Sequence, residues 1–377
     1  MTKSTNCSSK GPQVSNSVGP GSPQGVQSVP SFERSKRFAD ANASAYHEPR
    51  QARDRVGLAD SVYEPVCDGL ERVKRRLHSL CENQSPFLAE LLDHVLETKG
   101  KRVRPAITLL CSQFHPNDGK KAETMAAAVE LLHIATLIHD DTVDNSDIRR
   151  GKVTVSKMWG RNAAVLLGDY VFATSATFVC DTENVRVIRR FSETIMELSS
   201  GELHEMVATY DWAQTREQYE KRIYNKTASL FTTASESGAV LSGAPESVVD
   251  ALRHYGYSLG MAFQIIDDIL DFEGNPDEIG KPVGNDLSQG IMTLPAIMYI
   301  ERNSVDNPLV DYFKNPEDSE SLKKAVAAIQ SSSVMRDSYA VAEQYCDSAL
   351  ANLAALDNIP ALASLKELVN YVVQRRS

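Results

Sequence analysis

Two clusters of aspartates in this chain each follow an apolar helical stretch, LLHIATLI in one case and FQII in the other. The clusters are Asp140, Asp141 and Asp144 in the first, and Asp267, Asp268 and Asp271 in the second. Residues four apart on a helix lie about 40° apart around its axis, so Asp140 and Asp144 share a face. The same spacing in the second cluster predicts a second acidic helix face.

Carboxylates packed this closely repel one another unless a cation neutralises them, and oxygen-only ligands suit Mg²⁺. Solvated helix faces explain most runs of charge. Here, however, each cluster directly follows apolar turns, which places it at the end of an otherwise buried helix. A calcium EF-hand is excluded, because the sixth position counted from Asp144 is Arg149, where that loop needs glycine. The two clusters together therefore predict a magnesium site.

Basic residues stand close to both acidic clusters. Lys101, Arg102 and Arg104 lie in GKRVRP, Arg149 and Arg150 follow the first cluster, Lys226 lies in YNKTA, and Lys281 follows the second cluster. Lys226 precedes Thr227 at a predicted helix start, where free N–H groups favour anions. Each cation by itself could be an ordinary surface residue. As a set beside the acidic faces, they favour a site that holds diphosphates through metal.

The composition limits the class of protein. The 377 residues are 42% hydrophobic and carry a net charge of −10, which makes the chain a poor binder of nucleic acid. The six cysteines form no CxxC pair, so neither a zinc site nor a disulfide framework is indicated, and a reducing compartment is the natural interpretation. No apolar run reaches the roughly 18 residues of a membrane span, so we predict no transmembrane segment.

Apolar periodicity divides the chain into two parts. Residues 1–55 are rich in Ser, Gly and Pro and are predicted to form a disordered tail. Residues 56–377 are predicted to form one all-α domain, a large helical bundle almost without strand signals. The first 30 residues contain no Arg and no amphipathic helix. Import into an organelle is therefore less favoured than a cytoplasmic location.

The motifs GKRVRP, HDDTVDNSDIRRG, YNKTA, FQIIDDILDF and GKPVGNDLSQG-IMTLP resemble, in that order, those of the trans-type polyprenyl diphosphate synthases. The resemblance covers roughly residues 58–377 and implies the isoprenoid synthase fold, in which helices surround a central cavity. The last motif departs from the family: Asn285–Asp286 stands where many relatives have two aspartates, and Ile291–Met292 where many have a lysine. These departures put the fine geometry of that loop in doubt.

The resemblance implies a role for each matching residue. Mg²⁺ would be held by Asp140, Asp144, Asp267 and Asp271, and Asp141, Asp268 and Lys226 would complete the catalytic set. The allylic diphosphate would contact Arg149, Lys226, Thr227, Gln264 and Lys281. Isopentenyl diphosphate would contact Lys101, Arg104, His133 and Arg150. For His133 the competing interpretation is a satisfied core histidine, which is the usual role of a histidine on an apolar face.

The implied reaction is a head-to-tail trans condensation, in which the allylic C–O bond breaks and the double bond of isopentenyl diphosphate attacks the allylic cation. Ala135 and Thr136, five and four residues before Asp140, are small, whereas short-chain relatives carry Phe or Tyr there. We therefore predict a long-chain product, larger than geranylgeranyl diphosphate, for quinone side chains. Leu131 and Leu132, one turn earlier, could form a floor.

Other functions stay open at this stage. A short-chain synthase making farnesyl or geranylgeranyl diphosphate is the nearest enzymatic alternative. A terpene cyclase would not need the second diphosphate pocket that GKRVRP indicates. A non-catalytic subunit of a heteromeric synthase should lack one or both acidic motifs, and this chain has both. Family members are usually dimers, so the resemblance implies a homodimer, with a heteromer possible.

Overall fold

In the computed structural model, the described residues are 60–97, 100–273, 283–303 and 307–374, and they fall within one compact unit, Glu48–Ser377. The predicted tail 1–55 and Lys281 lie outside the described residues, so the boundary at 55/56 stays a prediction. The longer helices are α2 (Cys67–His78), α3 (Pro86–Leu96), α4 (Val103–Cys111), α5 (Lys120–Val143), α7 (Arg161–Cys180), α8 (Val185–Val207), α9 (Arg216–Ile223), α10 (Ser229–Ser242), α11 (Glu246–Glu273), α14 (Leu294–Arg302), α16 (Ser319–Ser331), α17 (Val334–Leu353) and α18 (Pro360–Gln374). Shorter elements are α6 (Val155–Trp159), α13 (Asn285–Ser288), α15 (Pro308–Lys314), the 3₁₀ turns Asp60–Val62, Glu64–Val66, Ser79–Cys81 and Ser112–Phe114, and the π-helix η5 (Tyr224–Ala228).

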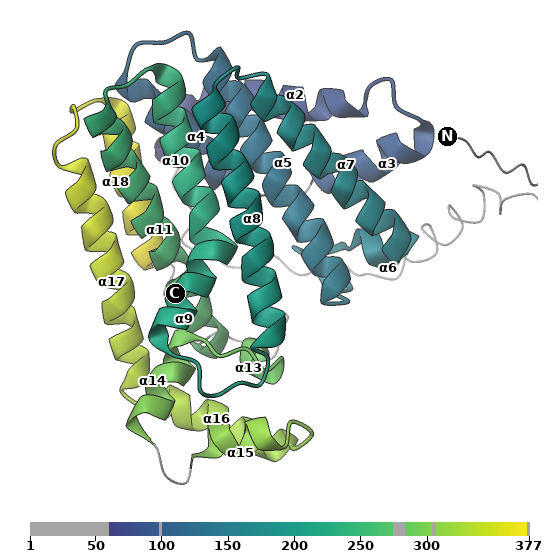
Figure 1. Cartoon of the computed structure of the whole chain (residues 1–377), viewed down its shortest axis with the longest axis vertical. Coiled ribbons are helices and arrows are strands. Elements are labelled where there is room, and N and C mark those ends of the chain that lie inside the picture. Colours follow the sequence, from purple (N-terminus) through teal and green to yellow (C-terminus); the bar gives the residue numbers. More distant parts are fainter. Residues whose placement is uncertain (1–59, 98–99, 274–282, 304–306, 375–377) are drawn as a thin grey trace, which may run out of the picture. The chain divides into compact units, whose positions relative to one another are not determined.

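The predicted all-α bundle is confirmed (Figure 1). Helix α5 packs along α7, α10 packs against α4 and α11, and α11 packs against α17. The C-terminal ends of α5, α8 and α11 point the same way in Figure 1, toward α13. These ends carry the acidic residues, so the packing brings segments far apart in the sequence to one end of the bundle.

The core of the unit is apolar along the helices that carry the site. In α5, Met125, Val129 and Leu131 are fully buried, and in α11 the same holds for Ile265 and Ile269. Burying side chains of this kind stabilises a fold by about 1.5–3 kcal/mol each. Because α5 is buried for most of its length, its last turn is held rigidly against the rest of the bundle.

The structure differs from the expected bundle almost without strands just after α5. A two-stranded antiparallel hairpin, β1 (Ile148–Arg149) paired with β2 (Lys152–Val153), follows α5, where no strand was expected. Its turn contains Arg150 and Gly151, both with positive φ (51° and 78°). Helix α14 begins only at Leu294, after Gly290 with φ 76°, and Pro295 lies at its start.

Helix α7 is long and apolar enough to cross a membrane by length and composition alone, which the sequence analysis did not predict. It packs along α5 on one side, and a third of its most apolar window is buried. Core helices of helical bundles pass the same test. Val165 and Leu166 of α7 are exposed, at 43% and 69% of their surface.

Candidate active site

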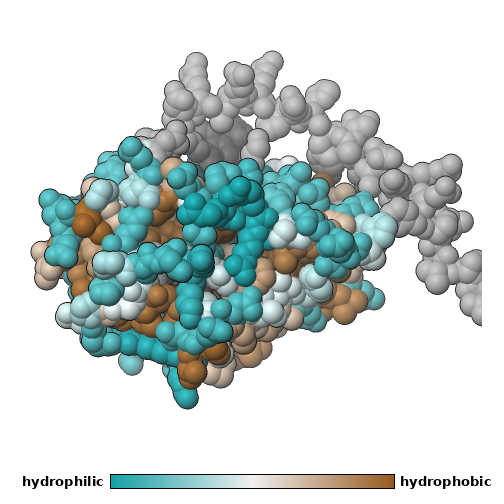
Figure 2. Space-filling model, turned by 90° about the horizontal axis from the view of Figure 1, so that it is seen from above, coloured by the Kyte–Doolittle hydropathy of each residue, from teal (hydrophilic) through white to brown (hydrophobic). Residues whose placement is uncertain are grey.

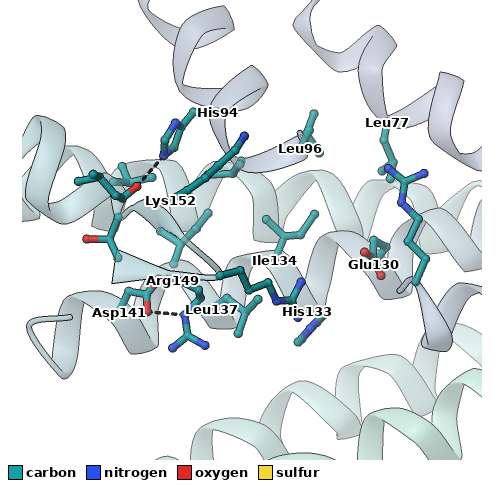
Figure 3. A pocket seen from close by; sticks show the side chains of 17 residues that line it. Leu77, His94, Leu96, Glu130, His133, Ile134, Leu137, Asp141, Arg149 and Lys152 are labelled. Carbon is teal, nitrogen blue, oxygen red and sulfur yellow. Dashed lines mark hydrogen bonds and ion pairs between the residues drawn. The ribbon is translucent and has the colours of Figure 1, made fainter. Parts of the chain in front are cut away.

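The first acidic cluster lies at the end of α5. Asp140 is largely buried, and burial, followed by the neighbouring Glu202, raises the pKa of its carboxyl to about 7. Asp144 is exposed at the C-terminal cap of the helix, and its negative charge also raises the pKa of Asp140. Asp141 points elsewhere: it accepts a hydrogen bond from Arg149 Nε at 2.5 Å (Figure 3). Asp140 and Asp144 thus act together electrostatically, while Asp141 pairs with the hairpin.

The second acidic cluster lies near the end of α11. Asp268 is buried and accepts hydrogen bonds from Tyr219 Oη and Gln264 Nε2, each at 2.7 Å. Burial nevertheless raises the pKa of Asp268 to about 7. Thr227 of the π-helix donates to Gln264 Oε1 at 2.5 Å. A chain of hydrogen bonds therefore links the YNKTA motif to the second acidic cluster, and the contact of Thr227 and Gln264 with the allylic diphosphate stays a prediction.

Asp286 adds a further carboxylate to this wall. Its backbone N–H donates to Asp271 Oδ2 at 3.1 Å, and Gly284 N–H donates to the carbonyl of Asp271 at 2.9 Å. Burial, and then the charges of Asp271 and Asp268, raise the pKa of Asp286 to about 8. The sequence analysis noted Asp286 only as the surviving acid of an altered motif. In the folded chain it belongs to the acidic wall.

Lys226 lies between the two acidic clusters. It forms ion pairs with Glu205 (2.6 Å) and Glu202 (3.2 Å) of α8. Although burial opposes it, these two carboxylates raise the pKa of the Lys226 ammonium above its usual value. The charge of Lys226 acts on both Asp140 and Asp286. One cation therefore reaches both acidic walls.

The expectation that Lys226 stands at a helix start was wrong. Tyr224–Ala228 is a π-helix that joins α9 to α10 without a break, so no free N–H groups of a helix start are present there. A π-turn inserts one extra residue into a helix and often occurs at functional sites. Here it carries Lys226 and Thr227. Side chains of α8 and α11, rather than backbone N–H groups, contact these two residues.

Sequence reasoning missed Glu202 and Glu205. They are three residues apart at the end of α8, a spacing that places both on one helix face. The sequence shows this spacing, but it does not show that both carboxylates pair with Lys226. Glu205 also approaches Arg222 Nε at 3.7 Å, and Arg222 donates to the carbonyl of Met292. Glu205 thus joins Lys226 to a buried arginine of α9.

Arg104 is a cation well placed to hold an anion. Its guanidinium carbon lies 4.6 Å from the centre of the Phe231 ring, and burial lowers the pKa of Arg104 to about 10. Among the described residues, its Nε is one of the few buried polar atoms without a hydrogen-bond partner. The charge of Asp267 acts on it from the second acidic cluster. A buried arginine N–H without an acceptor fits an anionic ligand.

A pocket between α2, α3, α5 and the hairpin contains His133, Arg150 and Glu130 (Figure 3). Burial lowers the pKa of His133 well below its usual value, and Arg104 and Arg150 lower it further. The imidazole is therefore neutral and can donate one N–H to an anion without adding charge. Lys101, which was predicted to join this group, instead donates to the hydroxyl of Tyr371.

The residues predicted to set product length are packed against their neighbours. Ala135 is only 1% exposed, and Leu131 and Leu132 one turn earlier are fully buried. Thr136 is partly exposed, and its hydroxyl donates to the carbonyl of His133 at 2.8 Å. The small side chains of α5 therefore lie directly above two leucines. The role of these positions in product length stays a prediction.

The acidic residues fit a divalent cation that a diphosphate helps to hold. Within the described ranges, no three His, Cys, Asp or Glu side chains form a ready metal site. Mg²⁺ commonly takes only one or two protein carboxylates and completes its shell with waters and substrate phosphates. Burial, and then the neighbouring carboxylates, raises the pKa of Asp140 and of Asp286, and such a cation would neutralise the negative charge gathered there. The donor set consists of oxygens, as Mg²⁺ prefers.

Comparison with known proteins places this geometry in a family. Residues 85–329 match the family described as polyprenyl synthetase. Heptaprenyl diphosphate synthase component 2 of Geobacillus stearothermophilus is 35% identical over 316 residues, which is 84% of this chain and 98% of that protein. Nonaprenyl diphosphate synthase of Mycobacterium tuberculosis is 34% identical over 326 residues, which is 85% of this chain and 96% of that protein.

Two solved structures agree with the sequence relatives. A decaprenyl diphosphate synthase from Rhodobacter capsulatus superposes with a TM-score of 0.79 at 33% identity, covering 84% of this chain and 99% of that one. A polyprenyl synthase from Caulobacter crescentus, complexed with calcium and isoprenyl diphosphate, has a TM-score of 0.79 at 31% identity. The match covers 86% of this chain and 100% of that one. By its fold, its acidic motifs and these likenesses, the chain belongs to the polyprenyl synthetase family.

Proposed function

We propose that this chain is a Mg²⁺-dependent prenyltransferase that condenses an allylic diphosphate with isopentenyl diphosphate to make a long-chain polyprenyl diphosphate. The observation that carries the proposal is the position of Lys226, whose charge reaches Asp140 of the first acidic cluster and Asp286 beside the second. One diphosphate held between two acidic walls requires such an arrangement. The names of the relatives, which include heptaprenyl, nonaprenyl and decaprenyl synthases, support the long-chain product.

Charge neutralisation drives the proposed chemistry. Asp140 and Asp144 on one side and Asp267 and Asp271 on the other would hold Mg²⁺, which would supply a Lewis acid for the leaving diphosphate. Lys226 adds a side-chain cation at the same place, and Glu205 at 2.6 Å holds its ammonium in position. Electrostatic stabilisation by charges that are preorganised around the leaving group is usually the largest single contribution to catalysis.

Isopentenyl diphosphate, the second substrate, would be held by a separate group of residues. Arg104 offers an N–H without a partner, and the neutral His133 offers another donor. Arg150 faces the same pocket from the hairpin. The buried ring of Phe231 under Arg104 excludes water on that side. Keeping water out matters, since an allylic cation that meets water becomes an alcohol.

The decisive experiment is incubation of the purified chain with Mg²⁺, labelled isopentenyl diphosphate and a farnesyl diphosphate primer. Chromatography of the extracted products gives the number of isoprene units added. We expect a product longer than geranylgeranyl diphosphate from this chain alone. A product that stops at geranylgeranyl diphosphate would favour the short-chain alternative, and no condensation at all would refute the proposal for the isolated chain.

Two observations bear on how the chain assembles: the name of a relative, which allows a heteromer, and an exposed apolar surface that a partner could cover. One relative is named as a component of a synthase, and apolar side chains are exposed on neighbouring faces of α7 and α8. The largest are Leu166, Met196, Leu203 and Met206, each more than 60% exposed. Apolar residues also reach the surface among charged ones on the face seen in Figure 2. We propose that a second copy of the chain covers α7 and α8.

Light scattering of the pure chain distinguishes these assemblies. A dimer of this chain that Leu166→Asp converts to a monomer supports the homodimer. A monomeric wild-type protein that gains activity only with a second polypeptide supports the heteromer. We also propose that residues 1–55 are dispensable and that the protein is cytoplasmic. The first point is tested by the activity of a 56–377 truncation, and the second by a fluorescent fusion.

A further inference from the structure

A basic groove lies beside the pocket that contains His133. Lys74 and His78 of α2 line one side, Arg150 and Lys152 of the hairpin line the other, and Arg102 lies between them. Leu96, Arg102, Arg150 and Lys152 line both the groove and the pocket. Figure 3 shows Lys152 near His94, with Leu96 beyond its amino end, on the side of the pocket formed by α3. The groove is therefore continuous with the pocket.

The charge of this groove is opposite to that of the chain. Among the residues that the structure describes, four permanently charged lysines and arginines line it against two carboxylates, Glu71 and Glu97, a surplus of two positive charges in a chain of net charge −10. Glu97 lies 3.5 Å from Lys152, but Glu71 and Lys74 share no ion pair among those described. A cleft with an excess of one sign of charge focuses the electric field and raises the local concentration of an oppositely charged ligand.

The groove leads to one substrate site rather than the other. It opens onto the pocket that contains Arg150 and the neutral His133, two of the residues proposed for isopentenyl diphosphate. Of the described residues proposed for the allylic diphosphate, only Arg149 lines the pocket, and its Nε is paired with Asp141. Lys226 and Thr227 lie on the π-helix instead and contact α8 and α11. The two diphosphates thus have separate surroundings.

We propose that this groove is the access route of isopentenyl diphosphate, and that Lys74 and Lys152 attract the diphosphate without holding it in the reactive complex. The inference rests on the proposed function. Lys74 does not line the pocket itself, and the side chain of Lys152 is 38% exposed, so both act from the approach to the site. Attraction of this kind weakens with salt, because the Debye length falls from about 14 Å at 0.05 M to about 4 Å at 0.5 M.

The test is Lys74→Glu, with Lys323→Glu as a control that makes the same charge change at an exposed position on α16. Reversing one charge about 10 Å from a diphosphate lowers kcat/KM for isopentenyl diphosphate roughly five- to ten-fold at 0.05 M salt, and less than about two-fold at 0.5 M. We expect kcat and the KM of the allylic substrate to stay unchanged. Lys152→Glu should act in the same direction, while Lys323→Glu should have no effect.

The inference is overturned if Lys74→Glu leaves kcat/KM for isopentenyl diphosphate unchanged at low salt. The same holds if it changes the kinetics of both substrates alike, or if salt does not alter the effect. Wild-type protein without condensation activity would count against the proposed function. In that case, calorimetric binding of isopentenyl diphosphate to the folded protein still tests the groove: weaker binding by Lys74→Glu supports it, and equal binding refutes it.

Discussion

Replacing Ala135 by phenylalanine should shorten the product. Ala135 lies five residues before Asp140 on α5, or about 7.5 Å along the helix axis at about 1.5 Å per residue. Helix α5 continues for about 22 Å beyond Ala135 to its start at Lys120. If the growing chain follows this face, a ring at Ala135 leaves about a quarter of the roughly 30 Å between Asp140 and Lys120. We expect a product of farnesyl or geranylgeranyl size.

The same substitution tests whether a tunnel exists at this position. Ala135 is only 1% exposed, so a ring forced into solid packing would cost about 1–3 kcal/mol. For a helical unit of about 310 residues, the unfolding entropy is about 0.65 kcal/mol per kelvin, and the melting temperature would fall by about 2–5 °C. Beside a tunnel, the ring fills space that the prenyl chain would otherwise occupy, and the melting temperature should stay close to that of the wild type.

The assay combines product chromatography with thermal unfolding followed by circular dichroism. Ala351→Phe, at an exposed position on α17, is the matched control and should keep the wild-type product. If Ala135→Phe is inactive, Ala135→Leu gives a smaller obstruction on the same face. A product of wild-type length from a folded, active Ala135→Phe variant would refute the proposed path along α5.

Three further predictions follow from the site. Asp140→Asn and Asp267→Asn should each lower kcat by about 10²–10³-fold while the circular dichroism spectrum is unchanged, because each removes a charge that holds the metal; wild-type turnover would contradict their role. Chelation with EDTA should abolish condensation and added Mg²⁺ should restore it, whereas activity that resists chelation would exclude metal dependence. Tyr219→Phe should lower the melting temperature by about 2–5 °C, because buried Asp268 loses one hydrogen bond worth about 1.5–3 kcal/mol. An unchanged melting temperature in calorimetry would show that the hydrogen bond from Gln264 is enough to stabilise the buried Asp268 carboxylate.

Local sequence determined the helical class and the existence of the site. Apolar residues at helical spacing, followed by Asp140 and Asp144, indicated a buried helix with an acidic end, and α5 has that form. Apolar residues followed by Asp268 likewise indicated a buried helix with an acidic end, and α11 has that form. These features depend on neighbours within a few helical turns, which a single sequence displays directly. The family resemblance of the motifs also agrees with the relatives found by comparison.

Only the tertiary structure decided the partners of these residues. Arg149 pairs with Asp141 because an unexpected hairpin turns the chain back beside α5. Lys226 lies on a π-helix and pairs with Glu205, 21 positions earlier, because α8 packs against that π-helix. Periodicity reports which face of a helix is buried, but not which other helix covers it. Charge pairing across helices depends on that packing, so it is absent from the local pattern.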